Sequence, residues 1–163
     1  MFQKKLEFIF LSIIAISLMI LAKNYYDNYS YNNNEISDEY KRLIIEKEQE
    51  ILHLMQQNYG FAFKVPLIIS DEFTGRVYGV TSYVNGEIKI YLNKKVMRES
   101  MEYVIDSVIA HEYAHALMFK QGYLYSGDDG HSALWQQTCV KLGGVNCAQY
   151  VDNHDIVMGK LPF

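Results

Sequence analysis

The sequence predicts an α+β fold, with a small antiparallel sheet packed on one long helix and a transmembrane helix at the N-terminus. Three observations predict this arrangement. Residues 8–22 form an uncharged, mostly apolar run, an Asn85-Gly86 pair separates two strand-like segments, and apolar residues recur every three or four positions over residues 101–120. Asn-Gly is a strong hairpin signal, and the three-to-four spacing is that of an amphipathic helix. Half of the 163 residues are hydrophobic, which suffices for the core of one domain.

The apolar run at the N-terminus predicts a membrane anchor. As a helix the run would span about 22 Å, short of the ~30 Å hydrocarbon core. Lys4 and Lys5 precede the run and Lys23 follows it, and lysine side chains near a helix end can reach back to the membrane surface. We therefore expect an uncleaved anchor over residues 1–23 that contacts lipid through residues 6–22. A cleaved signal peptide is the first alternative, although its cleavage site would be poor, and an interfacial helix is the second.

The charges that flank this segment predict its orientation. Two lysines and the amino terminus lie before the apolar run, and only one lysine lies close after it. Positive charge stays on the cytoplasmic side of a membrane. We therefore expect a single-pass protein with a cytoplasmic N-terminus and an extracytoplasmic domain.

The rest of the chain divides at a polar segment. Residues 24–35 contain five asparagines and no aliphatic residue, which is typical of a linker. We therefore place the folded domain at residues 36–163. Its first helix is expected to begin at Ser37, a favourable N-cap residue, and to end by Gly60.

Three short segments of the domain are predicted strands. They are residues 65–69, 77–84 and 87–92. Apolar and polar residues alternate along the last of them, which indicates a strand with one buried face. Arg76 and Tyr83 are assigned to the exposed face of this sheet rather than to substrate contacts.

The centre of the chain carries the pattern H-E-x-x-H, at His111-Glu112-Tyr113-Ala114-His115, inside the predicted helix. Two imidazoles one turn apart share a helix face and can bind a single tetrahedral metal ion. Glu112 is offset by one residue, so it is placed to take a proton from a water molecule at the metal rather than to bind the metal. The bare pattern also arises by chance in ordinary amphipathic helices, so the surrounding sequence must support it.

A catalytic zinc site needs a third protein ligand, and the chain offers two candidates. His131 follows a turn-rich loop, residues 123–130, and opens a second helical stretch at residues 132–142. His154 lies further along, in a segment with weaker periodicity. The motif alone leaves the choice open, and position favours His131. Tyr123 and Tyr125, in the same loop, are candidates for stabilising an oxyanion.

Several of these features occur together, in the same order, in a known family. They are the strand at residues 86–93, the His111-Glu112-x-x-His115 helix, Gly130-His131, Trp135 four positions later and Leu142-Gly143. Over residues 78–144 the chain resembles a SprT-like zinc metallopeptidase domain. The resemblance implies an enzyme that hydrolyses polypeptide with one Zn²⁺ ion and with Glu112 as general base. The metal ligands that it implies are His111, His115 and His131.

Charge separates the functional alternatives. The net charge is −4 for the whole chain and remains −4 without residues 1–35, whereas nucleic-acid-binding domains are basic. This argues against nucleic acid as a partner, and against an intracellular SprT-like protease acting on nucleic-acid-bound proteins. A non-catalytic, zinc-stabilised interaction domain is the other alternative, but a structural zinc site does not need Glu112. We favour a membrane-tethered zinc endopeptidase.

The two cysteines connect the chemistry of the chain to its location. Cys139 falls in the helical stretch after His131, and Cys147 follows a Gly143-Gly144 pair that lets the chain double back. Disulfides persist in oxidising compartments and are rare in the cytosol. We therefore expect Cys139 and Cys147 to be bonded if the domain is exported, and to remain free thiols if it is not.

Overall fold

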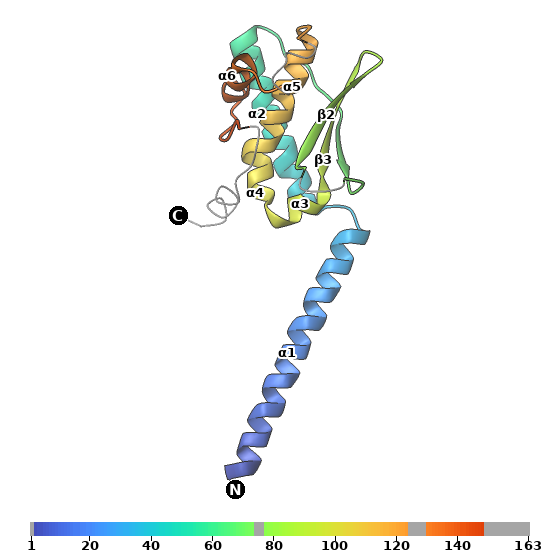
Figure 1. Ribbon diagram of the computed structural model, residues 1–163, viewed down its shortest axis with the longest axis vertical. Helices are drawn as coiled ribbons and strands as arrows, with labels where there is room; N and C mark the ends of the chain where they lie inside the picture. Colours follow the sequence, from blue (N-terminus) through green and yellow to red (C-terminus); the bar gives the residue numbers. More distant parts are fainter. Residues whose placement is uncertain (1, 74–76, 124–129, 149–163) are drawn as a thin grey trace. The chain divides into compact units, whose positions relative to one another are not determined.

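The computed structural model describes residues 2–73, 77–123 and 130–148 (Figure 1). The chain divides into two compact units, one ending at Ser37 and the other beginning at Asp38. The first unit holds helix α1 (Phe2–Asn33), and the second holds the other described helices and a three-stranded sheet. The predicted α+β fold class is confirmed.

Helix α1 is long and apolar enough to cross a membrane, a property that signal sequences share. It runs to Asn33 and therefore includes most of the segment that the sequence assigned to a linker. Nothing interrupts it, because the first glycine is Gly60 and the first proline is Pro66. The Asn33 side chain also donates a 2.8 Å hydrogen bond to the carbonyl oxygen of Tyr29, one turn earlier. Residues 24–33 are thus helical, although most of their side chains are exposed.

Helix α2 (Asp38–Tyr59) starts directly after Ser37 and is followed by Gly60 at a φ of 76°. Both ends lie where the sequence predicts them. A positive φ suits glycine at the end of a helix because no Cβ is present to clash. One face of α2 is buried through Ile44, Ile51 and Met55.

The sheet has the strand order β1-β3-β2, with β1 at Leu67–Ser70, β2 at Gly79–Val84 and β3 at Glu87–Asn93. Strands β2 and β3 form the predicted antiparallel hairpin, and Asn85 and Gly86 both have positive φ, as a tight two-residue turn requires.

One pairing corrects the prediction of an antiparallel sheet, because β1 runs parallel to β3. The chain reverses direction twice between these two strands, once before β2 and once after it. Two reversals leave β1 and β3 pointing the same way, and β2 occupies the opposite edge of β3. The sheet is therefore mixed.

A nearly continuous helical segment follows the sheet. It consists of α3 (Lys94–Glu99), α4 (Met101–Tyr103), the π-helical turn η1 (Val104–Val108) and α5 (Ile109–Lys120). The helix predicted over residues 101–120 is confirmed, with one π turn inside it. Such turns often lie beside functional sites, and this one ends three residues before His111.

Helix α6 (Ala133–Lys141) follows, and Ser132 caps its N-terminus by accepting a hydrogen bond from the backbone N–H of Trp135. Before it, α5 ends at Lys120, Gly122 follows with a φ of 85°, and the N–H of Tyr123 donates to the carbonyl of Met118.

Helix α5 is the centre of the domain. Strands β2 and β3 pack on one side of it, and helices α2 and α6 also pack against it (Figure 1). Several of the largest fully buried side chains come from α2, β3, α5 and α6, namely Ile51, Met55, Ile90, Leu92, Ile109, Leu117 and Trp135. A helix covered on several sides is held rigidly, which suits an element that carries a metal-binding motif.

Candidate metal centre

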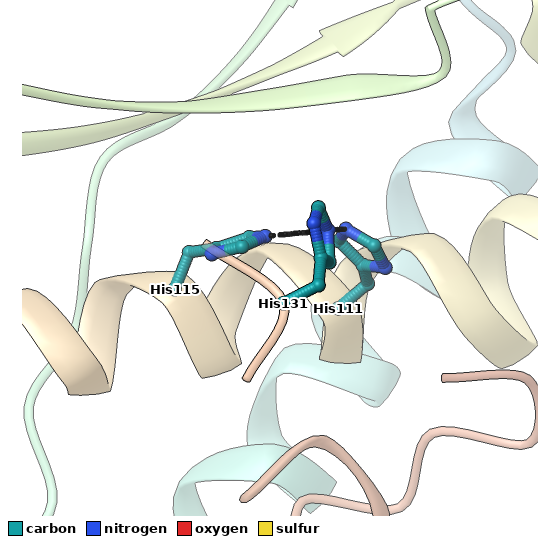
Figure 2. Close-up of side chains that lie close together, drawn as sticks. All are labelled: His111, His115 and His131. Atoms are coloured by element: carbon teal, nitrogen blue, oxygen red, sulfur yellow. Dashed lines mark hydrogen bonds between the residues drawn. The ribbon is translucent and has the colours of Figure 1, made fainter. Parts of the chain in front are cut away.

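Three histidine side chains converge on one point (Figure 2). His111 and His115 project from one face of α5, and His131 reaches them from the loop that precedes α6. The Nε2 atoms of His111 and His115 are 3.3 Å apart. The Nε2 atom of His131 lies 3.2 Å from that of His115 and 3.1 Å from that of His111.

These separations fit the ligands of one metal ion. Tetrahedral zinc holds imidazole nitrogens at about 2.0–2.1 Å, which places any two of them about 3.3 Å from each other. The three nitrogens of the cluster form a nearly equilateral triangle of that size. Imidazole donors suit zinc and several other transition metals. The cluster could therefore hold a metal ion, with a fourth position left open.

Local structure explains how His131 reaches the other two histidines. The preceding residue, Gly130, has a φ of 82°, a conformation that favours glycine. A Cβ at Gly130 would lie 3.3 Å from Cε1 of His115, so the backbone comes close to the imidazole. Ser132 then starts α6. The loop thus ends in three residues that respectively turn the chain, supply the imidazole and begin the helix.

Trp135 packs against all three imidazoles. Its ring centroid lies 4.6 Å from that of His111, 5.0 Å from that of His115 and 4.4 Å from that of His131. The side chain is 1% exposed, so it shields one side of the cluster from solvent. Such contacts restrict the imidazole rotamers and orient the nitrogens.

Burial favours the uncharged form of the two imidazoles on α5. It lowers the pKa of His111 to about 4, and the neighbouring His131 adds to the effect. Burial likewise lowers the pKa of His115 to about 3, with further contributions from His111 and His131. Both side chains are therefore neutral at pH 7, which is the form that binds a metal.

Glu112 lies on the side of α5 that faces β2, and it is 4% exposed. The hydroxyl oxygen of Thr81 lies 2.7 Å from its Oε2 atom and 2.9 Å from its backbone carbonyl oxygen. Burial raises the pKa of Glu112 to about 7, and the hydrogen bonds from Thr81 oppose that rise. A carboxyl group with this pKa can both accept and release a proton near neutral pH.

Comparison with known families identifies the chain. The model of the SprT-like family matches residues 48–154, which is more than half of the chain. The chain belongs to the SprT-like family. The match starts within α2 and includes the sheet, the histidine cluster and α6. No curated protein and no solved structure matches the chain.

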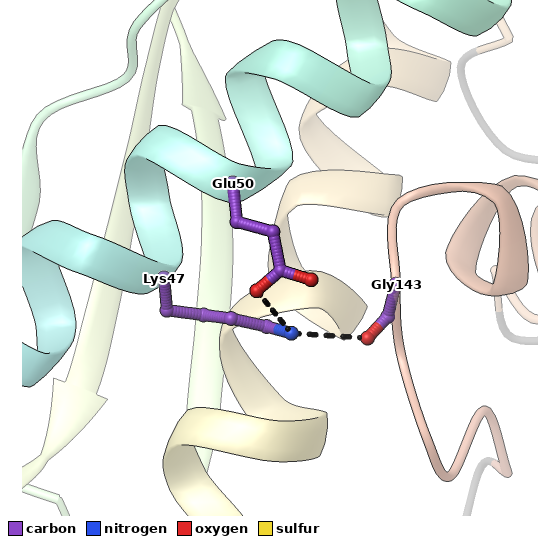
Figure 3. A network of polar contacts seen from close by, with 3 residues as sticks. All are labelled: Lys47, Glu50 and Gly143. Carbon is purple, nitrogen blue, oxygen red and sulfur yellow. Dashed lines mark hydrogen bonds and ion pairs between the residues drawn. The ribbon is translucent and has the colours of Figure 1, made fainter.

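In this SprT-like chain, α2 holds the C-terminal end of α6 (Figure 3). The Nζ atom of Lys47 lies 3.1 Å from the carbonyl oxygen of Gly143 and 3.1 Å from Oε2 of Glu50. About three helical turns after Lys47, the side-chain amide of Asn58 donates a 3.0 Å hydrogen bond to the carbonyl of Lys141. Since α6 carries Trp135 and follows His131, these contacts support one side of the metal centre.

A disulfide between Cys139 and Cys147 folds the segment after α6 back onto that helix. Gly144 lies inside this loop, and a Cβ there would come within 2.6 Å of Sγ of Cys139. The N–H of Val145 then donates to the carbonyl of Asp106 within the π turn. The same short segment thus connects α6 with the helix that carries the motif.

The structure brings together three of the four residues that the sequence predicted for the site, the histidines, and the carboxylate of the fourth, Glu112, lies against Thr81 on β2. His131 completes the cluster, whereas the alternative ligand, His154, lies outside the described residues, as do Arg76 and Tyr125. Tyr123 is described and half-exposed.

Sequence reasoning missed the residues that surround Glu112. Gly79 and Thr81 both face it from β2, and a Cβ at Gly79 would lie 2.8 Å from Oε1 of Glu112. The alternation of side chains along a strand places residues 79, 81 and 83 on one face. That face could have been found from the sequence, but its contact with α5 depends on the packing of sheet on helix.

Proposed function

We propose that this protein is a membrane-tethered zinc metallopeptidase that hydrolyses peptide bonds within polypeptides. The convergence of three Nε2 atoms within 3.3 Å of one another carries the proposal. Three histidines leave one position of a tetrahedral site open, which distinguishes catalytic from structural zinc sites. A buried carboxyl group on the neighbouring residue, Glu112, and membership of the SprT-like family support the same conclusion.

The chain's own residues divide the chemistry between them. Zinc, when bound, would polarise the scissile carbonyl group and increase the acidity of water. Glu112 accepts on its carboxylate a proton from the water that attacks the carbonyl carbon, and delivers it to the leaving amine as the peptide bond breaks. Thr81 keeps the carboxylate oriented, and Trp135 keeps the imidazoles in place and water away from one side of the site.

Strand β2 offers an edge on which an extended peptide can bind. The carbonyl of Tyr78 accepts a hydrogen bond from the N–H of Asn93 on β3. Backbone groups alternate in direction along a strand, so residues 80, 82 and 84 of β2 also direct theirs toward β3. Gly79, Thr81 and Tyr83 then direct theirs away from β3, and β2 pairs with no other described strand. A substrate segment added to this edge would lie beside Glu112.

Metal analysis of the purified chain tests the ligand set. We expect one zinc per chain, and loss of zinc and of activity on substitution of His111, His115 or His131 by alanine. His53 is exposed on α2, so His53→Ala is the matched control and should retain both. Retention of zinc and activity by His131→Ala, together with loss of both by His154→Ala, would show that His154 is the third ligand.

Tryptophan fluorescence gives a second measurement of metal binding. Trp135 is the only tryptophan of the chain and lies within 5.0 Å of each ligand imidazole. Removal of zinc by a chelator should change its emission, and returning one equivalent of zinc should restore it. An emission spectrum that does not respond to zinc would contradict binding at this cluster.

The N-terminal unit supports a retained anchor with the domain outside the cytoplasm. Helix α1 is long and apolar enough to span a membrane, its positive charges lie mostly before the apolar run, and the Cys139–Cys147 disulfide suits an oxidising compartment. Added protease should digest the domain on intact cells. Protection until lysis would place the domain inside, and a mature N-terminus near Lys23 would instead show a cleaved signal peptide.

A further inference from the structure

We propose that Tyr83 and Phe119 form an apolar subsite beside the metal centre, which selects unfolded polypeptide carrying a bulky apolar side chain near the scissile bond. The inference rests on the proposed function, because it concerns the same site. It adds the substrate class, and it assigns a role to a tyrosine that the sequence placed on an exposed face.

The two rings come from different elements and lie against each other. Tyr83 is on β2 and Phe119 is on α5, and their ring centroids are 5.7 Å apart with 32° between the ring planes. Tyr83 is 41% exposed and Phe119 is half-buried. The pair is thus ordered by its mutual contact while it still presents apolar surface to solvent.

The position of Phe119 on α5 places the pair next to the metal ligands. Phe119 follows His115 by four residues, which is about 6 Å along the helix axis and about 40° around it. Viewed down the helix axis, the Phe119 side chain therefore points between the directions of His115 and Glu112. It lies about one turn beyond His115 toward the C-terminal end of α5.

Strand β2 leads to the same place. The side chains of Thr81 and Tyr83 project to one face, about 7 Å apart. Thr81 contacts Glu112 and Tyr83 contacts Phe119. The aromatic pair therefore lies two residues further along β2 than the contact with the Glu112 carboxyl group.

An extended peptide on the β2 edge would bring a side chain to this pair. Extended chains advance about 3.3 Å per residue, and every second side chain points the same way. A peptide with its scissile bond at the metal would therefore direct the side chain about two residues away toward Tyr83 and Phe119.

The chemistry of the pair determines which side chain fits. An aliphatic or aromatic group would cover both rings and remove apolar surface from water. A charged group would lose its hydration against the ring faces. Folded proteins bury most of their bulky apolar side chains, so extended segments that carry them at an edge strand come mainly from unfolded polypeptide. The subsite thus favours unfolded over native substrates.

Peptide selectivity of the full chain in detergent tests this inference. The probes are peptides that differ only two residues from the cleaved bond, where they carry Phe, Leu, Ser or Asp. We measure kcat/KM with the zinc-loaded wild type, and peptide affinity with zinc-loaded Glu112→Gln by fluorescence anisotropy. The binding measurement does not depend on hydrolysis.

We expect Phe and Leu peptides to be preferred over Ser and Asp peptides by about tenfold or more, the range for one apolar side chain in a pocket. Tyr83→Ala and Phe119→Ala should reduce the preference to about twofold with unchanged zinc content. Val84→Ala is the control, because Val84 is 59% exposed and lies on the opposite face of β2. It should keep the wild-type preference.

Two outcomes would overturn the subsite: equal kcat/KM for all peptides in the wild type, or a preference that Tyr83→Ala retains. Tyr83 is exposed, so this variant stays informative even if Phe119→Ala fails to fold. A preference seen in binding, and lost in the Tyr83 variant, would support the subsite even if the wild type hydrolysed no peptide. Absence of hydrolysis together with selective binding would contradict the proposed hydrolytic function and leave the subsite supported.

Discussion

The hydroxyl oxygen of Thr81 lies 2.7 Å from Oε2 of Glu112 and 2.9 Å from the backbone carbonyl oxygen of the same residue. A hydroxyl group carries one proton, so Thr81 donates to one of these oxygens at a time. In either state the contact connects β2 to α5 at the residue that directly follows His111. Thr81 is therefore a positioning residue for the carboxylate.

Thr81→Val is expected to lower kcat by about 10- to 100-fold, because a hydrogen bond to a charged group contributes about 1.5–3 kcal/mol. Valine keeps the shape of the side chain and removes the donor, so zinc content and KM should change little. Thr81→Ser should restore most of kcat. If the serine variant is as slow as the valine variant, the role of Thr81 is packing rather than hydrogen bonding.

Gly79→Ala is expected to displace Glu112. The added Cβ would lie 2.8 Å from Oε1 and 2.9 Å from Cγ of that residue, and overpacking of this kind destabilises by about 1–3 kcal/mol. Activity should fall while zinc remains bound. Val80→Ala, one residue along the strand, is the comparison and should leave kcat near the wild-type value. A fully active Gly79→Ala enzyme would show that the carboxylate can move without loss.

Lys47→Met is expected to lower the free energy of unfolding by about 1–3 kcal/mol, because it leaves the carbonyl of Gly143 without its partner. Glu50 is 53% exposed at its side chain, and exposed ion pairs contribute at most about 1 kcal/mol. Glu50→Gln should therefore have the smaller effect. Denaturant unfolding of both variants measures the difference, and equal losses would assign the stabilisation to the ion pair instead.

Reduction of the Cys139–Cys147 disulfide is expected to lower the free energy of unfolding by about 2–3 kcal/mol, the value for so short a loop. These are the only cysteines of the chain, so reductant should have no effect on a variant with both replaced by alanine. Alkylation of exported protein without reductant, followed by mass spectrometry, tests the bond directly. Two alkylated thiols would rule it out and weaken the case for an extracytoplasmic domain.

Local geometry explains which parts of the fold were predictable. His111 and His115 share a helix face through their spacing alone, and Asn85-Gly86 defines its turn without help from the rest of the chain. His131 could be favoured because a turn-rich loop precedes it and a helical stretch follows it. Each of these features depends on a few consecutive residues.

Features that depend on tertiary packing were not predictable in the same way. The parallel pairing of β1 requires knowledge of which edge of β3 it occupies. The π turn before α5 leaves no clear pattern in the spacing of apolar residues. Its contact with the rest of the domain, a hydrogen bond from the N–H of Val145 to the carbonyl of Asp106, joins segments that are far apart in the sequence. The role of Thr81 appears only when β2 lies on α5.

Hydrolysis of an unfolded protein by zinc-loaded wild type and Glu112→Gln, compared at equal zinc content, tests the central claim most directly. A positioned general base contributes about 10²- to 10⁴-fold to the rate. We predict that the wild type cleaves the substrate and that the variant, with one zinc per chain and an unchanged fold, is at least about 100-fold slower. Equal rates for the two proteins would contradict the assignment of Glu112 as the base in a zinc-dependent peptidase.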